Sequence, residues 1–163
     1  MANILLNGLA ESLITALANE IRVIELYSKC LKHEISDDMK DVISAIINAK
    51  KRHMKMLSDF FEKKFNKKLD DSKIKELSLE NIKSLAFEQY TLHLLDVALG
   101  YQTRGKDHLE RSAQNFSDYK DVQALFTKLI EEEEEYIAMI EKEIKAEQGK
   151  PFNDFELDLF VRE

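Results

Sequence analysis

The stretch Ile43–Leu57, ISAIINAKKRHMKML, decides how the rest of this chain folds. At helical spacing, one of its faces carries Ile43, Ile46, Lys50, His53 and Leu57. That face is apolar except for an amine and an imidazole, which a helix can bury only if other elements supply partners for them. The stretch therefore predicts a helix with a polar pair in the middle of its buried face.

The same spacing returns in the last third of the chain. The second set is Phe126, Leu129, Glu133, Tyr136 and Ile140. Glu133 stands at the position of Lys50, and Tyr136 stands at the position of His53. We therefore expect two helical segments that share one pattern, each with polar groups in the middle of its apolar stripe.

The composition predicts a single all-α domain over residues 1–163. A chain of 163 residues, of which 44% are hydrophobic, is long enough for one core and has no reason to divide. One proline and four glycines leave few helix breakers. The net charge of -7, with basic residues scattered among acidic ones, argues against a nucleic-acid partner. A single cysteine, Cys30, excludes an internal disulfide.

The N-terminal segment over residues 1–19 is partly apolar, but it lacks the features of a signal peptide. Asn7 and Glu11 interrupt it, and no basic start precedes it. No apolar run approaches the roughly 20 residues of a membrane span. We therefore expect no membrane association and a cytoplasmic protein.

Two helices are expected in the first half of the chain. The first spans about residues 7–32, with Glu20 in the middle of its apolar face. The second spans about residues 37–64, because Ser36 followed by Asp37 and Asp38 is typical of a capped helix start with an acidic first turn. The short connection predicts that these helices are antiparallel neighbours.

A long polar crossover over residues 66–78 should lead to a third helix capped by Ser78. Its inward face is expected to consist of Ile82, Leu85, Leu92, Leu95 and Leu99 around one acid, Glu88. This face repeats the spacing of the first helix, with Glu88 at the position of Glu20. Residues 100–116 are then expected to form an irregular extension of the third helix.

Ser117 and Asp118 are expected to cap a fourth helix that ends near Gln148, where Gly149 and Pro151 stop it. Residues 149–163 should form an extended C-terminal tail, because apolar and acidic side chains alternate along its second half. Such a tail needs an apolar surface, on its own chain or on a partner.

The polar positions resemble those of the rubrerythrin branch of the ferritin-like family over about residues 7–148. The matching features are the E-x-x-V-x-x-x-Y of Glu20–Tyr27, the K-x-x-H of Lys50–His53, Glu88 on the third helix, and the E-x-x-Y of Glu133–Tyr136. The resemblance implies an antiparallel four-helix bundle with a long crossover between its second and third helices.

The resemblance also implies a metal-binding site. Glu20 and Glu88 would be terminal ligands, Glu133 a bridging carboxylate and His53 a nitrogen ligand. The hydroxyl of Tyr27, one to two turns from Glu20, could donate a hydrogen bond to the ligands.

Two positions depart from the family pattern. Lys50 replaces the family's other bridging glutamate, and Tyr136 replaces its second histidine. A lysine ammonium cannot bind a metal ion unless it loses its proton, and Tyr136 could do so only as a phenolate. The rubredoxin module of full-length rubrerythrins is absent too, because one cysteine cannot build its iron site.

Charge allows either an occupied or a metal-free site. Three carboxylates, Lys50 and one divalent ion sum to zero, which indicates one iron or manganese ion per chain. Without a metal ion, Lys50 and a protonated His53 leave a charge of -1, which one protonated glutamate cancels. Both states therefore remain open at this point.

Two classes of function follow. In the first, the protein is a metal-dependent oxidoreductase that acts on peroxide or dioxygen and receives electrons from a separate electron-donor protein. In the second, Lys50 replaces the metal charge, and the bundle is a non-catalytic binding or assembly module. A homodimer is expected in either case, on family grounds and because the apolar tail needs a surface.

Overall fold

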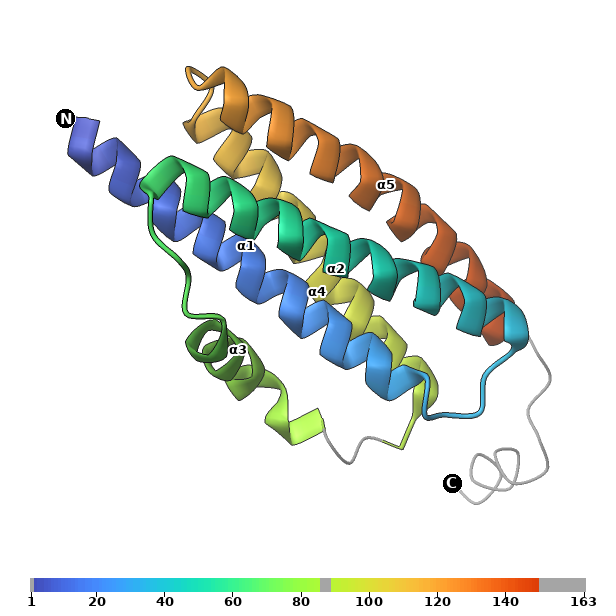
Figure 1. Cartoon of the computed structure of the whole chain (residues 1–163). Coiled ribbons are helices and arrows are strands. Elements are labelled where there is room, and N and C mark those ends of the chain that lie inside the picture. Colours follow the sequence, from blue (N-terminus) through green and yellow to red (C-terminus); the bar gives the residue numbers. More distant parts are fainter. Residues whose placement is uncertain (1, 86–88, 150–163) are drawn as a thin grey trace.

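The computed structural model describes residues 2–85 and 89–149 (Figure 1). Its elements are α1 (Ala2–Cys30), α2 (Asp37–Phe65), α3 (Asp71–Leu79), the 3-10 helix η1 (Glu80–Leu85), α4 (Thr91–Asn115) and α5 (Lys120–Gln148). The described part of the chain is helical and contains no strand. The prediction of an all-α protein is therefore confirmed.

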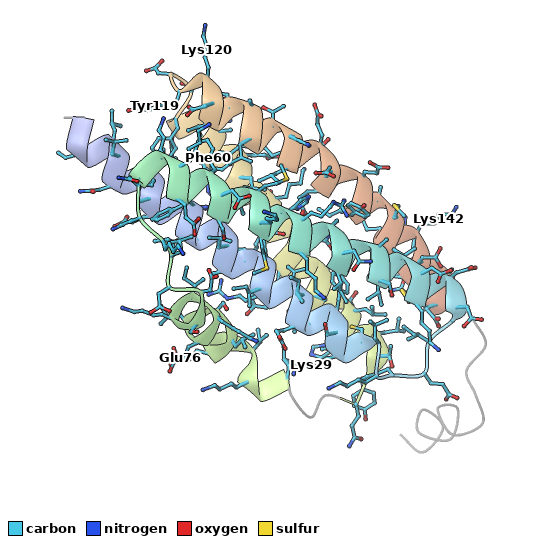
Figure 2. All side chains as sticks on the ribbon, viewed as in Figure 1. Lys29, Phe60, Glu76, Tyr119, Lys120 and Lys142 are labelled. Atoms are coloured by element: carbon cyan, nitrogen blue, oxygen red, sulfur yellow. The ribbon has the colours of Figure 1, made fainter. Side chains whose placement is uncertain are left out.

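Four long helices lie side by side and form the body of the molecule. α1 packs against α2 and α4, and α5 packs against α4 and α2. Figure 1 shows α1 and α5 running in one direction and α2 and α4 in the other, so that each neighbouring pair is antiparallel. α3 lies outside the four, against α1, within the segment that returns the chain from the end of α2 to the start of α4. Charged side chains such as Glu76, Lys120 and Lys142 project outward (Figure 2).

α2 begins and ends as its sequence predicts. Ser36 has an extended backbone, and its Oγ accepts a hydrogen bond from the backbone nitrogen of Met39 at 3.1 Å. At the other end, Asn66 adopts the left-handed conformation with φ 53°, which ends the helix. These caps place the basic pair of α2 at a defined depth in the bundle.

The third helix differs from the prediction. Ser78 does not cap it, because Ser78 lies inside α3, whose cap is Asp70. Gln89 and Tyr90, directly before α4, are not helical, so the described residues of the inward face predicted over residues 82–99 do not lie on one helix. Residues 100–115 are regular α-helix, and the prediction of an irregular extension is wrong.

The start of α5 also differs. Its cap is Tyr119, which makes no capping hydrogen bond with its side chain, so Ser117 and Asp118 do not cap it. α5 ends at Gln148 with Gly149 as its C-cap, as predicted. Pro151 and the rest of the predicted tail over residues 149–163 lie outside the described residues, except for Gly149 itself.

The buried faces of the two hairpins repeat in nearly the same register. The buried residues Leu13, Ala16, Glu20, Tyr27 and Cys30 of α1 match, in order and spacing, the buried residues Leu95, Ala98, Gln102, Leu109 and Ser112 of α4. The faces of α2 and α5 match with Lys50 aligned to Glu133, as predicted from sequence. In this register Gln102 takes the position on α4 that Glu20 takes on α1. The match predicted from sequence aligned Glu20 with Glu88 instead, which lies outside the described residues.

One helix in the described chain, Ile4–Cys30 within α1, is long and apolar enough to cross a membrane by length and composition. Its mean hydropathy is 1.2, so the expectation that no apolar run approaches a span is wrong. The core helix of a soluble protein and a signal sequence can have the same length and apolar composition. In this bundle the apolar face of α1 packs against α2 and α4 and includes the buried Glu20.

Candidate metal centre

Four ionisable side chains from three helices meet inside the bundle. They are Glu20 from α1, Lys50 and His53 from α2, and Glu133 from α5, with exposed fractions of 4%, 2%, 0% and 1%. The sequence predicted that each of them points inward, and the structure brings all four together. We call this set the polar layer.

Lys50 lies between the two carboxylates. Its Nζ donates one hydrogen bond to Glu20 Oε1 at 3.2 Å and another to Glu133 Oε1. Burial lowers the pKa of Lys50, but the charges of Glu20 and Glu133 outweigh burial and raise it above its ordinary value. Lys50 is therefore an ammonium ion that holds one oxygen of each glutamate.

His53 faces the same two glutamates with one nitrogen and a third glutamate with the other. Its Nδ1 lies 3.5 Å from Glu20 Oε2 and 3.4 Å from Glu133 Oε1. Its Nε2 lies 3.0 Å from Glu132 Oε2. Burial lowers the pKa of His53, but the carboxylates of Glu133 and Glu20 beside it raise the pKa to about 9. Burial raises the pKa of Glu133, while Lys50 and His53 lower it by a larger amount.

Glu132 is a residue of the site that the sequence analysis did not identify. It contacts His53 and lies 3.6 Å from Arg52 at the surface of α2. A signal was available, because Leu125, Leu129, Glu132 and Tyr136 share one helical face of α5. Within a run of consecutive glutamates, that signal is easily read as a solvated surface.

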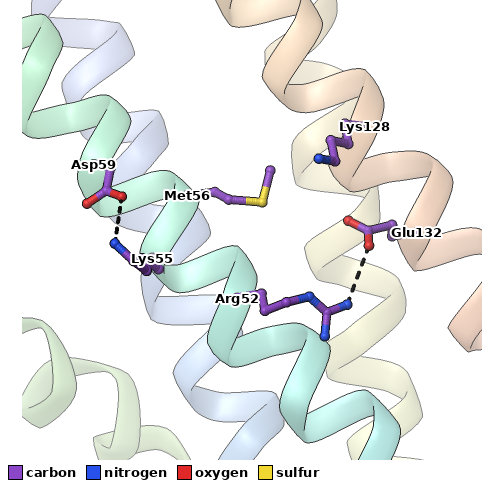
Figure 3. Close-up of a pocket in the computed structure, with 6 residues that line it drawn as sticks. All are labelled: Arg52, Lys55, Met56, Asp59, Lys128 and Glu132. Carbon is purple, nitrogen blue, oxygen red and sulfur yellow. Dashed lines mark hydrogen bonds and ion pairs between the residues drawn. The ribbon is translucent and has the colours of Figure 1, made fainter.

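A pocket of about 350 Å³ opens on the outer side of Glu132, between α2 and α5. Figure 3 shows the residues that line it, which are Arg52, Lys55, Met56, Asp59, Lys128 and Glu132. Glu132 thus lines the pocket and also contacts His53. The polar layer is separated from a solvent-facing pocket by one carboxylate.

Tyr27 and Gln102 form a buried hydrogen-bonded pair between α1 and α4. Tyr27 Oη donates to Gln102 Oε1 at 2.6 Å, and neither side chain is exposed to solvent. The pKa of Tyr27 is raised well above its usual range, mainly by burial and also by Cys30 and Glu133. Tyr27 was predicted from sequence and Gln102 was not, because the predicted match of the first and third helices aligned Glu20 with Glu88.

Glu88 and Tyr136, the other two positions predicted for the metal site, are not among the four residues of the polar layer. Glu88 lies outside the described residues. Tyr136 is half-buried and packs against the core around Val23 and Ile140. A hydrogen bond with Tyr136 raises the pKa of Arg52, which places this phenol toward the surface of α2.

Three residues of the polar layer offer ligand atoms that could hold a metal ion. Among the described residues, Glu20 Oε2, His53 Nδ1 and Glu133 Oε2 are buried atoms without a hydrogen-bond partner. Ligand atoms of these three residues all lie within 4.8 Å of one another. Carboxylate oxygen and imidazole nitrogen are ligands that iron and manganese accept.

Comparisons of this chain with protein-family models, with curated proteins and with solved structures find no match.

Proposed function

We propose that this chain is a ferritin-like bundle protein of the rubrerythrin type that binds one iron or manganese ion through Glu20, His53 and Glu133. One observation carries the proposal: donor atoms from three helices lie within 4.8 Å of one another in a buried layer. The antiparallel neighbours and the long return from α2 to α4 are the arrangement expected of ferritin-like bundles. The activity we propose is that of an oxidoreductase acting on peroxide or dioxygen.

In this function each residue of the polar layer, and Glu132 beside it, has its own role. Glu20, Glu133 and the Nδ1 atom of His53 hold the ion, which supplies redox chemistry when it is bound. Glu132 accepts a hydrogen bond from His53 Nε2. This hydrogen bond keeps Nδ1 of His53 unprotonated and directed at the ion. Lys50 orients both ligand carboxylates.

Charge supports one ion at this site. Glu20, Glu132 and Glu133 carry -3, and Lys50 with a divalent ion carries +3, so the set is neutral when His53 is neutral. A second divalent ion would leave a buried charge of +2, which is costly in a protein interior.

We also propose a cytoplasmic homodimer that receives electrons from a separate donor protein. The single Cys30 cannot build an iron–sulfur site of its own. The exposed side chains of Ile4 and Leu5, at one end of α1, are an apolar surface that a second copy would cover. Sedimentation at micromolar concentration tests this, and a monomer would contradict it.

A metal-free function is the second candidate, and the contacts of Lys50 favour it. Its ammonium donates to both glutamates, and the pKa of about 9 means that His53 is charged at neutral pH. Glu20, Glu132, Glu133, Lys50 and His53 then sum to -1 without an ion. In this case the bundle is a non-catalytic binding or assembly module.

Metal analysis of protein purified without added metal distinguishes the two functions. We expect close to one first-row transition metal ion per chain, and a large loss in His53→Ala, because His53 is the neutral nitrogen donor of the layer. His93→Ala, at an exposed position of α4, is the matched control and should keep its metal. A content near zero that stays there after anaerobic addition of Fe(II) would rule out the metal-dependent function and support the metal-free one.

A gain-of-function variant tests the assignment of the positions. Lys50→Glu, Gln102→Glu and Tyr136→His together restore the family's complete set of ligands, so this variant should bind two ions per chain. The variant without Gln102→Glu should bind the second ion more weakly. If the triple variant binds no more metal than the parent, the layer is not arranged as the ferritin-like proposal requires.

A further inference from the structure

The pocket between α2 and α5 lies where the bundle is least tightly closed. Of the four pairs of neighbouring long helices, α2 and α5 make the least extensive contact. Met56 lines the pocket, and Figure 3 shows its side chain pointing from α2 into the space between the two helices. Met56 and Phe60, four residues apart on one face of α2, are both only half-buried. α2 therefore leaves apolar surface uncovered at this pocket.

The charge at this pocket is opposite in sign to that of the whole chain. The chain carries -7, whereas three of the six residues that line the pocket are cations and two are anions. Arg52 Nη2 lies 3.6 Å from Glu132 Oε1. Lys55 Nζ lies 3.1 Å from Asp59 Oδ2 on the same helix. The third cation, Lys128, has no ion-pair partner in the part of the chain that the structure describes. The pocket thus suits a ligand that carries both acids and apolar groups.

The chain itself contains a segment of that composition. Residues 154–161, DFELDLFV, comprise three acids and five apolar residues. In an extended segment alternate residues face opposite sides, so the acids lie on one side and three of the apolar residues on the other. The apolar side matches the surface of Met56. The acids match the amines of Lys55 and Lys128, which belong to the two helices that border the pocket.

The chain after α5 is long enough for this segment to reach the pocket of its own molecule. Lys128 lies 20 residues before Gln148, the last residue of α5, which is about 30 Å along a helix. Fourteen residues follow Gly149, and an extended chain of that length spans about 46 Å. A tethered segment is present at a local concentration in the millimolar range, which favours its own molecule over a second copy.

We propose that residues 154–161 bind in the pocket between α2 and α5 of the same molecule. The apolar side of the segment packs on Met56, and its acids pair with Lys55 and Lys128. The bound segment covers Glu132, the carboxylate that separates the polar layer from solvent at this pocket. This inference does not depend on whether the polar layer holds a metal ion.

A nitroxide spin label near the end of the chain tests the contact in the full-length protein. Arg162→Cys provides the attachment point, since Cys30 is buried and its pKa is raised to about 12. In ¹³C-methyl-methionine NMR, we expect the label to remove most of the Met56 signal and to affect Met39 much less. Met39 is near the end of α5, because Ser36 N donates to Glu147 Oε1 at 3.3 Å. An unbound tail would affect Met39 at least as strongly as Met56, and that result would overturn the proposal.

A mixed sample identifies the molecule that supplies the tail. Spin-labelled chain without ¹³C is combined with an equal amount of ¹³C-labelled chain without the spin label. An unchanged Met56 signal in this mixture supports binding within one molecule. A loss of the Met56 signal in the mixture means that the tail binds a second copy, which overturns the proposal.

Charge reversal in the pocket tests the role of the two lysines. Lys55→Glu with Lys128→Glu should restore the Met56 signal. Raising the salt concentration to 1 M should restore part of it, because the Debye length falls to about 3 Å. Lys120→Glu with Lys142→Glu is the matched control, since both lysines project outward from α5 (Figure 2). The control should keep the loss of signal, and equal recovery in the two variants would overturn the proposal.

Charge reversal in the tail completes the test. Asp154→Lys, Glu156→Lys and Asp158→Lys together should restore the Met56 signal. Combined with the reversed pocket, the same three changes should bring back the loss of signal, because acids and cations have exchanged sides. An unchanged Met39 chemical shift verifies that each variant is folded. A loss of signal that persists in both single-sided variants, or that does not return in the combined variant, overturns the proposal.

Discussion

The hairpin of α1 and α2 and the hairpin of α4 and α5 share one apolar framework but differ in chemistry. Their buried positions repeat in nearly the same register, with Glu20 aligned to Gln102 and Lys50 to Glu133. The first hairpin supplies Glu20, Lys50 and His53 of the polar layer. The second hairpin supplies Glu133 of that layer and the buried Gln102. Packing requires only that the repeated positions be filled, so the apolar residues recur. The polar positions are free to differ, and one hairpin therefore carries both cations of the layer.

The largest effect is expected from removing the lysine that distinguishes the first hairpin. Lys50→Glu leaves His53 as the one cation of the polar layer beside Glu20 and Glu133, and it adds a third buried carboxylate. We expect it to lower the free energy of unfolding in chelator by about 4 kcal/mol. Denaturant unfolding measures this, and added Fe(II) or Mn(II) should restore part of the loss.

Lys51→Glu is the matched control for that variant. It makes the same change of charge at the next residue of α2, which is exposed. Its effect should stay within about 0.5 kcal/mol. Equal losses in the two variants would mean that net charge, and not the buried contacts of Lys50, determines the result.

A pH titration tests the other cation of the first hairpin. The pKa of His53 is raised from 6.5 to about 9, so its contribution is complete below about pH 6.5 and is lost as pH rises through about 9. The free energy of unfolding of chelator-treated protein should fall by up to about 3 kcal/mol over that interval. His53→Gln should flatten the profile, and a parent profile that is already flat would contradict the assignment.

The contact between the hairpins is tested by Tyr27→Phe. Removing the hydroxyl leaves Gln102 Oε1 buried without a donor, which should cost about 2 kcal/mol of stability. Tyr101→Phe removes a hydroxyl from a half-buried ring on α4 and should cost less than about 0.5 kcal/mol. Thermal or denaturant unfolding of both variants gives the comparison, and similar losses would show that the Tyr27 hydrogen bond contributes little.

The smallest effect concerns how the two hairpins start their second helices. Ser36→Ala removes the side-chain cap of α2 and should lower stability by about 1 kcal/mol. Ser117→Ala precedes α5, whose cap makes no side-chain hydrogen bond, and should have almost no effect. Equal losses at the two positions would show that Ser117 has a role at the start of α5 that the cap geometry does not reveal.

The sequence by itself determined the helical class, the N-cap of α2 and the inward direction of Glu20, Lys50, His53 and Glu133. These features depend on local spacing and on short-range hydrogen bonds, which the order of residues specifies. The repeat that aligns Lys50 with Glu133 could be read for the same reason, because both copies lie in uninterrupted helices with similar apolar residues.

Only the tertiary structure decided which residues of the second half join the layer. The sequence allowed Glu20 to be matched with Glu88 because leucine and isoleucine recur at many helical spacings, whereas the buried positions of α4 align Glu20 with Gln102. Gln102 and Glu132 became visible as site residues through contacts with Tyr27 and His53, which are distant in sequence. Whether a polar residue on a helix faces solvent or a partner depends on what packs against it, and spacing along one helix does not contain that information.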